Sequence, residues 1–210
     1  MSESVTSEKT PRLSIENHKK VTEVRNLHEK LIEGCRNNNR EAQFKIYKLY
    51  YKSMYNTALR ILNDTAEAED VMQESFLDAF RKIDTFRGES SFGAWLKRIV
   101  VNRSLDILKK QKEFRSIEEA GEEIPDNFEN ENYLEILSYK VDLIRRAIHM
   151  LPDNYRVILS LYLLEGYDHE EISQIMNVSN NVSRTRFSRA KAKLIDLIRS
   201  ENQNFQVFNA

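Results

Sequence analysis

Residues 168–191 carry the local signals of a helix–turn–helix, and these signals constrain the fold more than any other part of the chain. Asp168 is suited to cap a helix, and Glu171 stands at the reciprocal position of a capping box. Three apolar residues form one stripe of that helix: Ile172, Ile175 and Met176. Asn177 falls where the turn requires left-handed backbone, which asparagine tolerates better than most residues. Ser179 is placed to cap a second helix.

The predicted second helix is strongly basic. It carries one acid, Asp196, against six bases: Arg184, Arg186, Arg189, Lys191, Lys193 and Arg199. A helix–turn–helix with a basic second helix is suited to enter the major groove of DNA. A helical hairpin with a solvated basic face would show the same pattern.

Residues that interrupt helices are scarce in the whole chain. Five glycines and three prolines in 210 residues favour helices over a turn-rich β protein, so we expect an all-α fold. Cys35 is the one cysteine, which excludes an internal disulfide and fits a reducing cytoplasm. No apolar run approaches the length of a membrane span, about 20 residues. We therefore expect a cytoplasmic protein without membrane insertion.

Apolar periodicity predicts two small helical domains joined by a flexible acidic linker. The predicted ranges are a disordered tail over 1–22, a first domain over 23–112, the linker over 113–135, a second domain over 136–200 and a tail over 201–210. In the first domain, helices are expected over 44–61, 66–83 and 92–111, and Asp64 or Thr65 should cap the second of them. In the second domain, a helix that starts at Pro152–Asp153 should end at Gly166.

The linker is defined by its charge. Nine acids and one base, Arg115, lie between residues 113 and 135, too few apolar residues for a core. Flexible solvation of the linker explains these acids.

Motifs that carry catalysis are missing. Residues 169–173 begin like a zinc-protease helix, but Ser173 stands where the second histidine is required. The four histidines are scattered, and there is no phosphate-binding glycine loop, nucleophile elbow or cysteine pair. We expect no catalytic residue, no metal site and no cofactor.

Two separate stretches resemble one family, the sigma-70 family of bacterial RNA polymerase sigma factors, and especially its extracytoplasmic-function (ECF) group. Residues 68–76, 86–96 and 98–102 resemble region 2 of that family. Leu151–Pro152, Glu171–Ile172, Arg186 and residues 189–191 resemble region 4. Together the resemblance spans about residues 27–112 and 137–199, in the order and spacing of the family. The gap without a third folded domain is typical of the ECF group.

The resemblance implies a binding protein that joins core RNA polymerase, directs it to a promoter and helps to open the duplex. The helix from residue 66 to 80 would dock on the polymerase clamp through residues that share one face: Asp70, Gln73 and Glu74. The alternative is that these side chains only cap and solvate their helix.

The resemblance also implies that the loop over 86–91 captures an unstacked base of the −10 element. An aromatic wall and short polar donors suit an extruded base. The residues implied in −10 DNA binding are Phe86, Ser90, Ser91, Asn102, Arg98 and Arg103. The arginines would contact phosphates, and Trp95 is expected in the core.

In region 4 the family reads the −35 element with the second helix. The matching positions are Arg184, Thr185, Ser188 and Arg189, with Lys191 as a phosphate contact. The opposite strip should face the core: Ser183, Phe187, Ala190 and Leu194. The family usually has an apolar residue where this chain has Ser183. Either Ser183 bonds a carbonyl one turn back, or the helix begins elsewhere.

The expected partners are core RNA polymerase and promoter DNA, with an anti-sigma factor as a further partner; the free protein should be a monomer. One alternative is a helix–turn–helix regulator that acts without polymerase, which the region 2 resemblance disfavours. Another is an enzyme of nucleic-acid metabolism, which the missing metal and nucleophile sets disfavour.

Overall fold

The computed structural model describes residues 28–115 and 143–208, with side chains over 28–111 and 143–200. Helices and turns account for these residues, and no strand occurs in either range. The expected all-α class is confirmed. The predicted tail over 1–22 and the linker from residue 116 on lie outside the described residues.

The first helical unit consists of a helix over residues 28–36 followed by α2, α3, a short 3-10 turn and α4. Their bounds are Arg40–Leu62 for α2, Thr65–Arg81 for α3, Ile83–Thr85 for the turn and Phe92–Arg115 for α4. Asp64 caps α3 as predicted, because its carboxylate accepts a hydrogen bond of 2.8 Å from the backbone N–H of Glu67. The helix expected to end at residue 111 continues to Arg115, since no glycine or proline interrupts it there.

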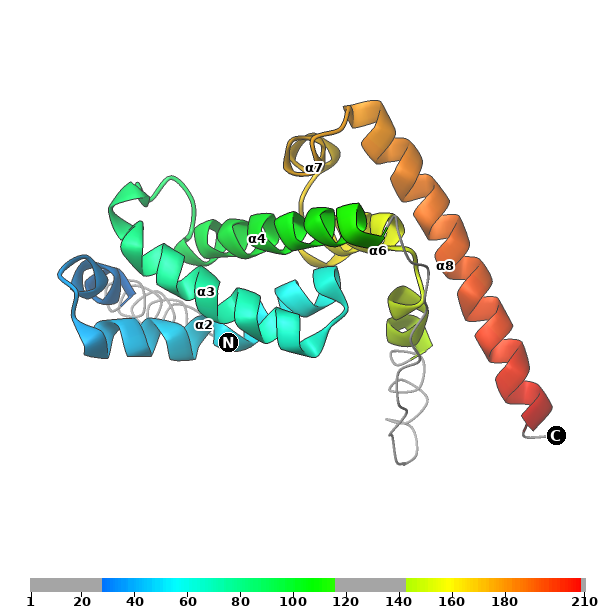
Figure 1. The fold of residues 1–210 in the computed structure, drawn as a ribbon, viewed down its shortest axis with the longest axis horizontal. Coiled ribbons are helices and arrows are strands. Elements are labelled where there is room, and N and C mark those ends of the chain that lie inside the picture. The colour runs from blue at the N-terminus through cyan, green and yellow to red at the C-terminus, as the bar shows by residue number, and fades with distance from the viewer. Residues whose placement is uncertain (1–27, 116–142, 209–210) are drawn as a thin grey trace, which may run out of the picture.

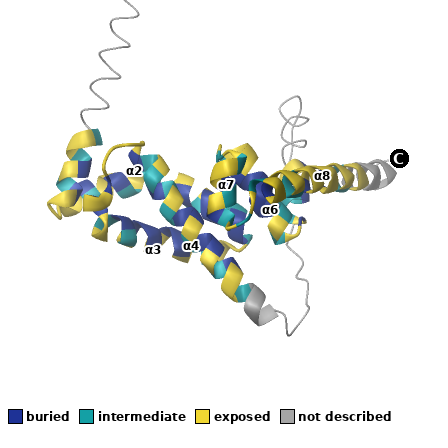
Figure 2. Cartoon of the chain, turned by 90° about the horizontal axis from the view of Figure 1, so that it is seen from above, coloured by how far each residue is buried: buried dark blue, intermediate teal, exposed yellow. Residues whose placement is uncertain are grey.

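Helices α2, α3 and α4 pack against one another pairwise and enclose the apolar core of this unit (Figure 1). In Figure 2 the buried residues lie on the faces that these helices turn toward each other. The fully buried side chains come from all three helices and include Met54, Ile61, Val71, Leu96 and Val100. Burial of these faces is the main source of stability, since each apolar side chain contributes about 1.5–3 kcal/mol.

The second unit comprises a helix over residues 143–149, then α6, a π-helical turn, α7 and α8. The bounds are Asp153–Leu159 for α6, Ser160–Leu164 for the π turn, His169–Met176 for α7 and Asn180–Phe208 for α8. The π turn is a difference from the regular helix that the sequence predicts up to Gly166. A π turn inserts one residue and redirects the side chains that follow.

The predicted caps of the helix–turn–helix are present. Asp168 and Glu171 form the reciprocal capping box at the start of α7, and Asn177 ends that helix with φ of 51°. The Ser179 hydroxyl accepts a hydrogen bond from the backbone N–H of Val182 at the start of α8.

The two units touch through α6 and the end of α2. The long helix α8, orange to red in Figure 1, packs on α6 and α7 with its first half and then runs past them. Among the described residues, no helix combines the length and the apolar content needed to cross a membrane.

Candidate nucleic-acid interface

The outer face of α8 carries the five residues that the sequence assigns to the −35 element. Arg184, Thr185, Ser188, Arg189 and Lys191 are all exposed. We call the first four the −35 strip. The opposite strip is turned inward: Ser183, Ala190 and Leu194 are buried, and Phe187 is half-buried against the core. The predicted division of this helix into two faces is therefore confirmed.

Two of these exposed side chains are tied to their own helix. The Nε of Arg184 donates a hydrogen bond of 2.8 Å to Asn180, and the Thr185 hydroxyl donates one of 2.8 Å to the carbonyl of Asn181. These local bonds orient the side chains before any ligand arrives.

Ser183 is buried at the core position, as one of the two alternatives predicted, but its hydrogen-bond partner is not the predicted carbonyl. Its hydroxyl shares a hydrogen bond of 3.0 Å with Nδ1 of His169, the first residue of α7. The His169 ring stacks on Tyr162, at 4.7 Å between centroids, and meets the edge of Phe187. A buried hydroxyl requires a partner, and a histidine from the neighbouring helix supplies it. The bonding to a carbonyl one turn back is wrong, and α8 begins at Asn180 without a shift.

The loop over 86–91 lies between the 3-10 turn and α4 and lines a small pocket together with Trp95. Ser90 and Ser91 are exposed, and the Ser91 hydroxyl accepts a hydrogen bond of 3.2 Å from the N–H of Ala94, so it caps α4. Gly88 has φ of 77°, a conformation that side chains rarely adopt.

Phe86 lies elsewhere than the sequence suggested. Its ring is 8% exposed and packs at 5.5 Å, between centroids, from both Phe92 and Trp95. Its carbonyl accepts a hydrogen bond of 2.9 Å from Arg36. Trp95, expected in the core, is only half-buried at the pocket wall. Of the two rings, Trp95 is therefore the one with more surface to offer a stacked base.

The aromatic cluster behind this loop reaches back to the start of the chain's described part. Phe92 contacts Tyr50 and His28, and the Tyr50 hydroxyl shares a hydrogen bond of 2.7 Å with Nε2 of His28. Burial lowers the pKa of His28, although nearby Glu29 acts in the other direction, and burial raises the pKa of Tyr50. The cluster thus supports the loop with rings that stay uncharged near neutral pH.

The predicted −10 contacts on α4 are in two different states. Arg98 and Asn102 are exposed. Arg103 instead lies between two carboxylates of α3, at 2.6 Å from Glu74 and 2.6 Å from Asp78. A guanidinium that already has two anionic partners is less available to a DNA phosphate.

The three residues assigned to the polymerase all lie on the exposed face of α3: Asp70, Gln73 and Glu74. Gln73 donates a hydrogen bond of 3.2 Å to Glu69, one turn earlier. Because Glu74 pairs with Arg103, the face assigned to polymerase and the helix assigned to −10 DNA share an ion pair.

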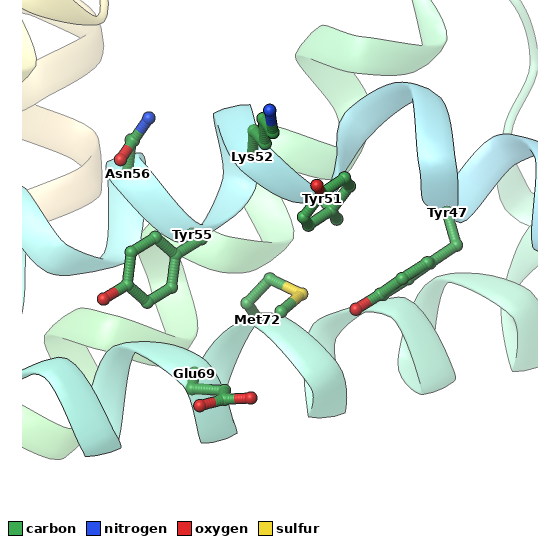
Figure 3. A pocket seen from close by; sticks show the side chains of 7 residues that line it. All are labelled: Tyr47, Tyr51, Lys52, Tyr55, Asn56, Glu69 and Met72. Atoms are coloured by element: carbon green, nitrogen blue, oxygen red, sulfur yellow. The ribbon is translucent and has the colours of Figure 1, made fainter.

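Beside this face, a groove runs between α2 and α3 (Figure 3). Tyr47, Tyr51 and Tyr55 follow one another along α2, with Met72 from α3 among their rings, and Glu69 and Lys52 lie at the edges. The sequence prediction did not include the groove or its three tyrosines. Their spacing of four residues, with a hydroxyl on every ring, was the available signal.

No cluster of three or more histidine, cysteine or carboxylate side chains suited to a metal ion occurs within the described ranges. Cys35 is fully buried, and burial raises the pKa of its thiol to about 11, as expected for a packing residue.

Comparison with known proteins identifies the family. The model for sigma-70 region 2 matches residues 46–114, and the model for sigma-70 region 4 matches residues 142–194. The ECF RNA polymerase sigma-E factor of Haemophilus influenzae is 35% identical over 131 residues, which cover 58% of this chain and 69% of that protein. The chain belongs to the sigma-70 family.

Further relatives place this sigma factor in the ECF group. The ECF RNA polymerase sigma factor SigW of Bacillus subtilis is 29% identical over 175 residues, which cover 79% of this chain and 93% of that protein. The chain is thus an alternative RNA polymerase sigma factor, and a helix–turn–helix regulator that acts without polymerase is not favoured. Sigma factors are transcription initiation factors.

Solved structures share the fold. The sigma factor RpoE from Bartonella quintana, in complex with the anti-sigma factor NepR, aligns with a TM-score of 0.53 and 21% identity, over 74% of this chain and 95% of that chain. CnrH, in complex with the cytosolic domain of CnrY, aligns with a TM-score of 0.51 and 19% identity, over 81% of this chain and 96% of that chain.

Proposed function

We propose that this ECF sigma factor divides promoter recognition between the −35 strip on α8 and a −10 surface on the first helical unit. We define the −10 surface as Ser90, Ser91, Trp95, Arg98 and Asn102. The observation that carries the proposal is the two-faced geometry of α8, with every predicted −35 contact exposed and the opposite strip turned inward. This is the geometry required of a helix that enters a major groove.

At the −35 element, Arg184 and Arg189 are the readers of base edges, because a guanidinium can donate two parallel hydrogen bonds to guanine. Thr185 and Ser188 add short polar contacts between them. Lys191 neutralises a phosphate and strengthens binding without reading sequence.

At the −10 element, the pocket beside the loop receives an unstacked base. Trp95 supplies the ring face, Ser90 lines the same pocket, and the exposed Ser91 follows it in the loop. Asn102 is exposed further along α4, where its amide can both donate to and accept from a base edge. Arg98 contacts the backbone of the same strand, and Arg103 joins it once its carboxylate partners are otherwise engaged.

Core RNA polymerase docks on the acidic face of α3 and the adjoining groove. Asp70, Gln73 and Glu74 offer an exposed polar stripe suited to a basic helix. The tyrosine rings of the groove add apolar area with hydroxyl tips, a combination enriched at protein interfaces.

The remaining partners follow from the same assignment. An anti-sigma factor is the natural regulator, as in the complexes of the two similar folds. The protein works as a monomer in the cytoplasm, where the polymerase is, and has no catalytic activity of its own. The two domains would extend over residues 23–112 and 136–200, with the acidic linker between them.

Run-off transcription tests the proposal. The purified protein is mixed with sigma-free core polymerase and fragments of the genome that encodes it, and transcripts are sequenced. Discrete start sites that appear only with the protein are expected, and Arg184→Ala should weaken their use by about 1–3 kcal/mol while still binding core. Stable DNA binding by a protein that never associates with core would contradict the proposal.

A further inference from the structure

One carboxylate of the second helical unit is buried in the first. The Glu165 side chain is only 2% exposed. Its Oε1 accepts a hydrogen bond of 3.0 Å from Nε of Arg60 on α2, and its Oε2 lies 2.9 Å from Nζ of Lys97 on α4. The Thr57 hydroxyl lies 3.2 Å from both oxygens. Two cations and a hydroxyl from two helices of one unit thus enclose one anion of the other.

The charged form of Glu165 is the stable one in this position. Burial acts to raise the pKa of the carboxyl, but hydrogen bonds and charge from Lys97 and Arg60 outweigh it, and the pKa lies below its ordinary value. Burial of a carboxylate is tolerated only with such partners. The contact therefore depends on charge complementarity between the two units.

The backbone before Glu165 is shaped to deliver this side chain. The π turn Ser160–Leu164 inserts a residue, and the N–H of Glu165 donates a hydrogen bond of 3.0 Å to the carbonyl of Ser160, five residues earlier. Gly166 then turns the chain with φ of 80°, and an added Cβ there would meet nothing within 4 Å. Glycine is thus required for conformation, not for space. Irregular turns of this kind concentrate where a side chain has a specific task.

A second contact fixes where the two units meet. The buried Arg156 of α6 donates a hydrogen bond of 3.1 Å to the carbonyl of Ile61, near the end of α2. Asn63, just after α2, donates one of 3.4 Å to the carbonyl of His149. These contacts lie at the end of α2, while Glu165 also reaches α4. The contacts at the end of α2 can act as a pivot, and the Glu165 contact can act as a latch.

The latch holds the second unit beside the −10 surface. A pocket between the units is lined on one side by Ser90, Ser91, Trp95 and Arg98. On the other side it is lined by Glu165 and Tyr167, which lie between the π turn and α7, and by Glu171 in the first turn of α7. We call residues 160–171 the cover segment. A DNA strand that approaches the −10 surface would meet the exposed Glu171 carboxylate, which repels its phosphates, and would find Lys97 and Arg60 already neutralised by Glu165.

We propose that the cover segment is an internal inhibitor of −10 binding, in which Glu165 takes the place of a DNA phosphate on Lys97 and Arg60. In the closed chain, Glu165 occupies Lys97 and Arg60 beside the −10 surface, and its release makes both cations available to DNA. This inference rests on the proposed −10 role of the first unit. It assigns Lys97, which is 25% exposed and paired with Glu165, to DNA in the open state.

The opening is measured on the full free protein by energy transfer between dyes at Glu89→Cys in the loop and Gln174→Cys on α7, both exposed positions. The buried Cys35, whose pKa is about 11, should not take up dye. Glu165→Arg should lower the transfer clearly, and Glu165→Gln should lower it less. The swap Glu165→Lys with Lys97→Glu restores an ion pair and should recover most of the wild-type transfer.

Binding of labelled oligo-dT of 12 nucleotides supplies the second readout. Glu165→Gln should bind this strand at least about threefold more tightly than the wild type, since the masked cations become available. Glu170→Gln is the matched control, because it removes the same charge from an exposed residue of α7 outside the pocket. The control should change affinity less than twofold.

Equal energy transfer in the wild type and in Glu165→Gln would overturn the latch. Equal gains in affinity for Glu165→Gln and Glu170→Gln would overturn it as well. Circular dichroism checks each variant; if Glu165→Arg loses helix, the decision rests on Glu165→Gln and the swap. Failure of every variant to bind the strand, with the transfer changes intact, would contradict the −10 assignment and leave the latch standing.

Discussion

The −35 strip and the −10 surface are two proposed DNA-facing regions of one chain that differ in how far the residues around them are engaged by other parts of the chain. On α8 the predicted contacts are exposed and oriented by bonds within their own helix. On the first unit, Ser90, Ser91, Arg98 and Asn102 are exposed, but the residues beside them are engaged: Phe86 is buried, Arg103 is paired with α3 and Lys97 is paired with Glu165. The difference fits the two substrates, since a duplex groove is a fixed target, whereas an unstacked strand appears only during opening.

The largest expected effect is on the support of the −10 loop. Phe92 is 2% exposed and contacts Phe86, Trp95, Tyr50 and His28. Phe92→Ala should cost about 3–5 kcal/mol of stability in the first unit, because it leaves a large cavity. Urea unfolding checks this value.

The same variant separates the two regions. The Phe92→Ala protein should still bind duplex DNA that carries the −35 element, because α8 packs in the other unit. Loss of −35 binding as great as the loss of −10 function would show that the regions are not independent.

The next largest effect is expected from a substitution in the −35 strip. Arg184→Ala should weaken promoter binding by about 1–3 kcal/mol, the worth of a good bidentate contact, and relax sequence preference at one position. Filter binding on matched and single-substituted promoters measures both. The matched control is Arg199→Ala, at a late α8 position outside the strip. An equal loss of affinity there would mean that Arg184 contributes only its charge and does not read a base.

The His169–Ser183 pair tests how the recognition helix is positioned. Removal of either partner leaves the other without its hydrogen bond, so each alanine variant should cost about 1 kcal/mol of stability. A double-mutant cycle should give a coupling of about 0.5–1.5 kcal/mol. Purely additive effects would mean that the bond has no energetic role.

A smaller effect is expected at Arg103, which contrasts with Arg184. Because its guanidinium is already bound by Glu74 and Asp78, Arg103→Ala should weaken −10 strand binding by the free protein by less than about 1 kcal/mol. The loss should grow when core polymerase occupies the α3 face. The same loss with and without core would contradict a shared ion pair between the two faces.

The effect of pH is the mildest. Burial and then the charge of Arg156 lower the pKa of His149, so the folded protein binds this proton less readily than the unfolded chain. The contribution of neutral His149 to the free energy of unfolding is fully present above about pH 6.5 and decreases as the pH falls through that value. Thermal unfolding between pH 7.5 and 5.5 measures it. His149→Gln should reduce the slope of stability against pH. The part of the slope that remains should come from His28, whose pKa is also lowered.

Local signals explain what the sequence predicted well. Asp64, Asp168 and Asn177 act on backbone a few residues away, so their roles as caps follow from their neighbours in the chain. The outward and inward strips of α8 follow from helical periodicity alone. These features fixed the all-α class and the position of the −35 strip.

The features that the sequence did not predict depend on partners distant in the chain. Glu165 meets Lys97 and Arg60, and Arg103 meets Glu74, across gaps that no local pattern spans. The π turn deviates from the regular period, and Phe86 is buried by rings that only the tertiary fold brings together. Long-range charge pairing therefore decides which predicted contacts are open.

The most direct test of the contrast uses a promoter found by run-off transcription. Binding is measured for its −35 duplex and for its single-stranded −10 segment, with the free protein and with the protein on core polymerase. The account predicts that the free protein binds the −35 duplex nearly as well as the bound form, while the −10 strand binds at least about tenfold more tightly on core. Equal affinity of the free and core-bound protein for the −10 strand would contradict it.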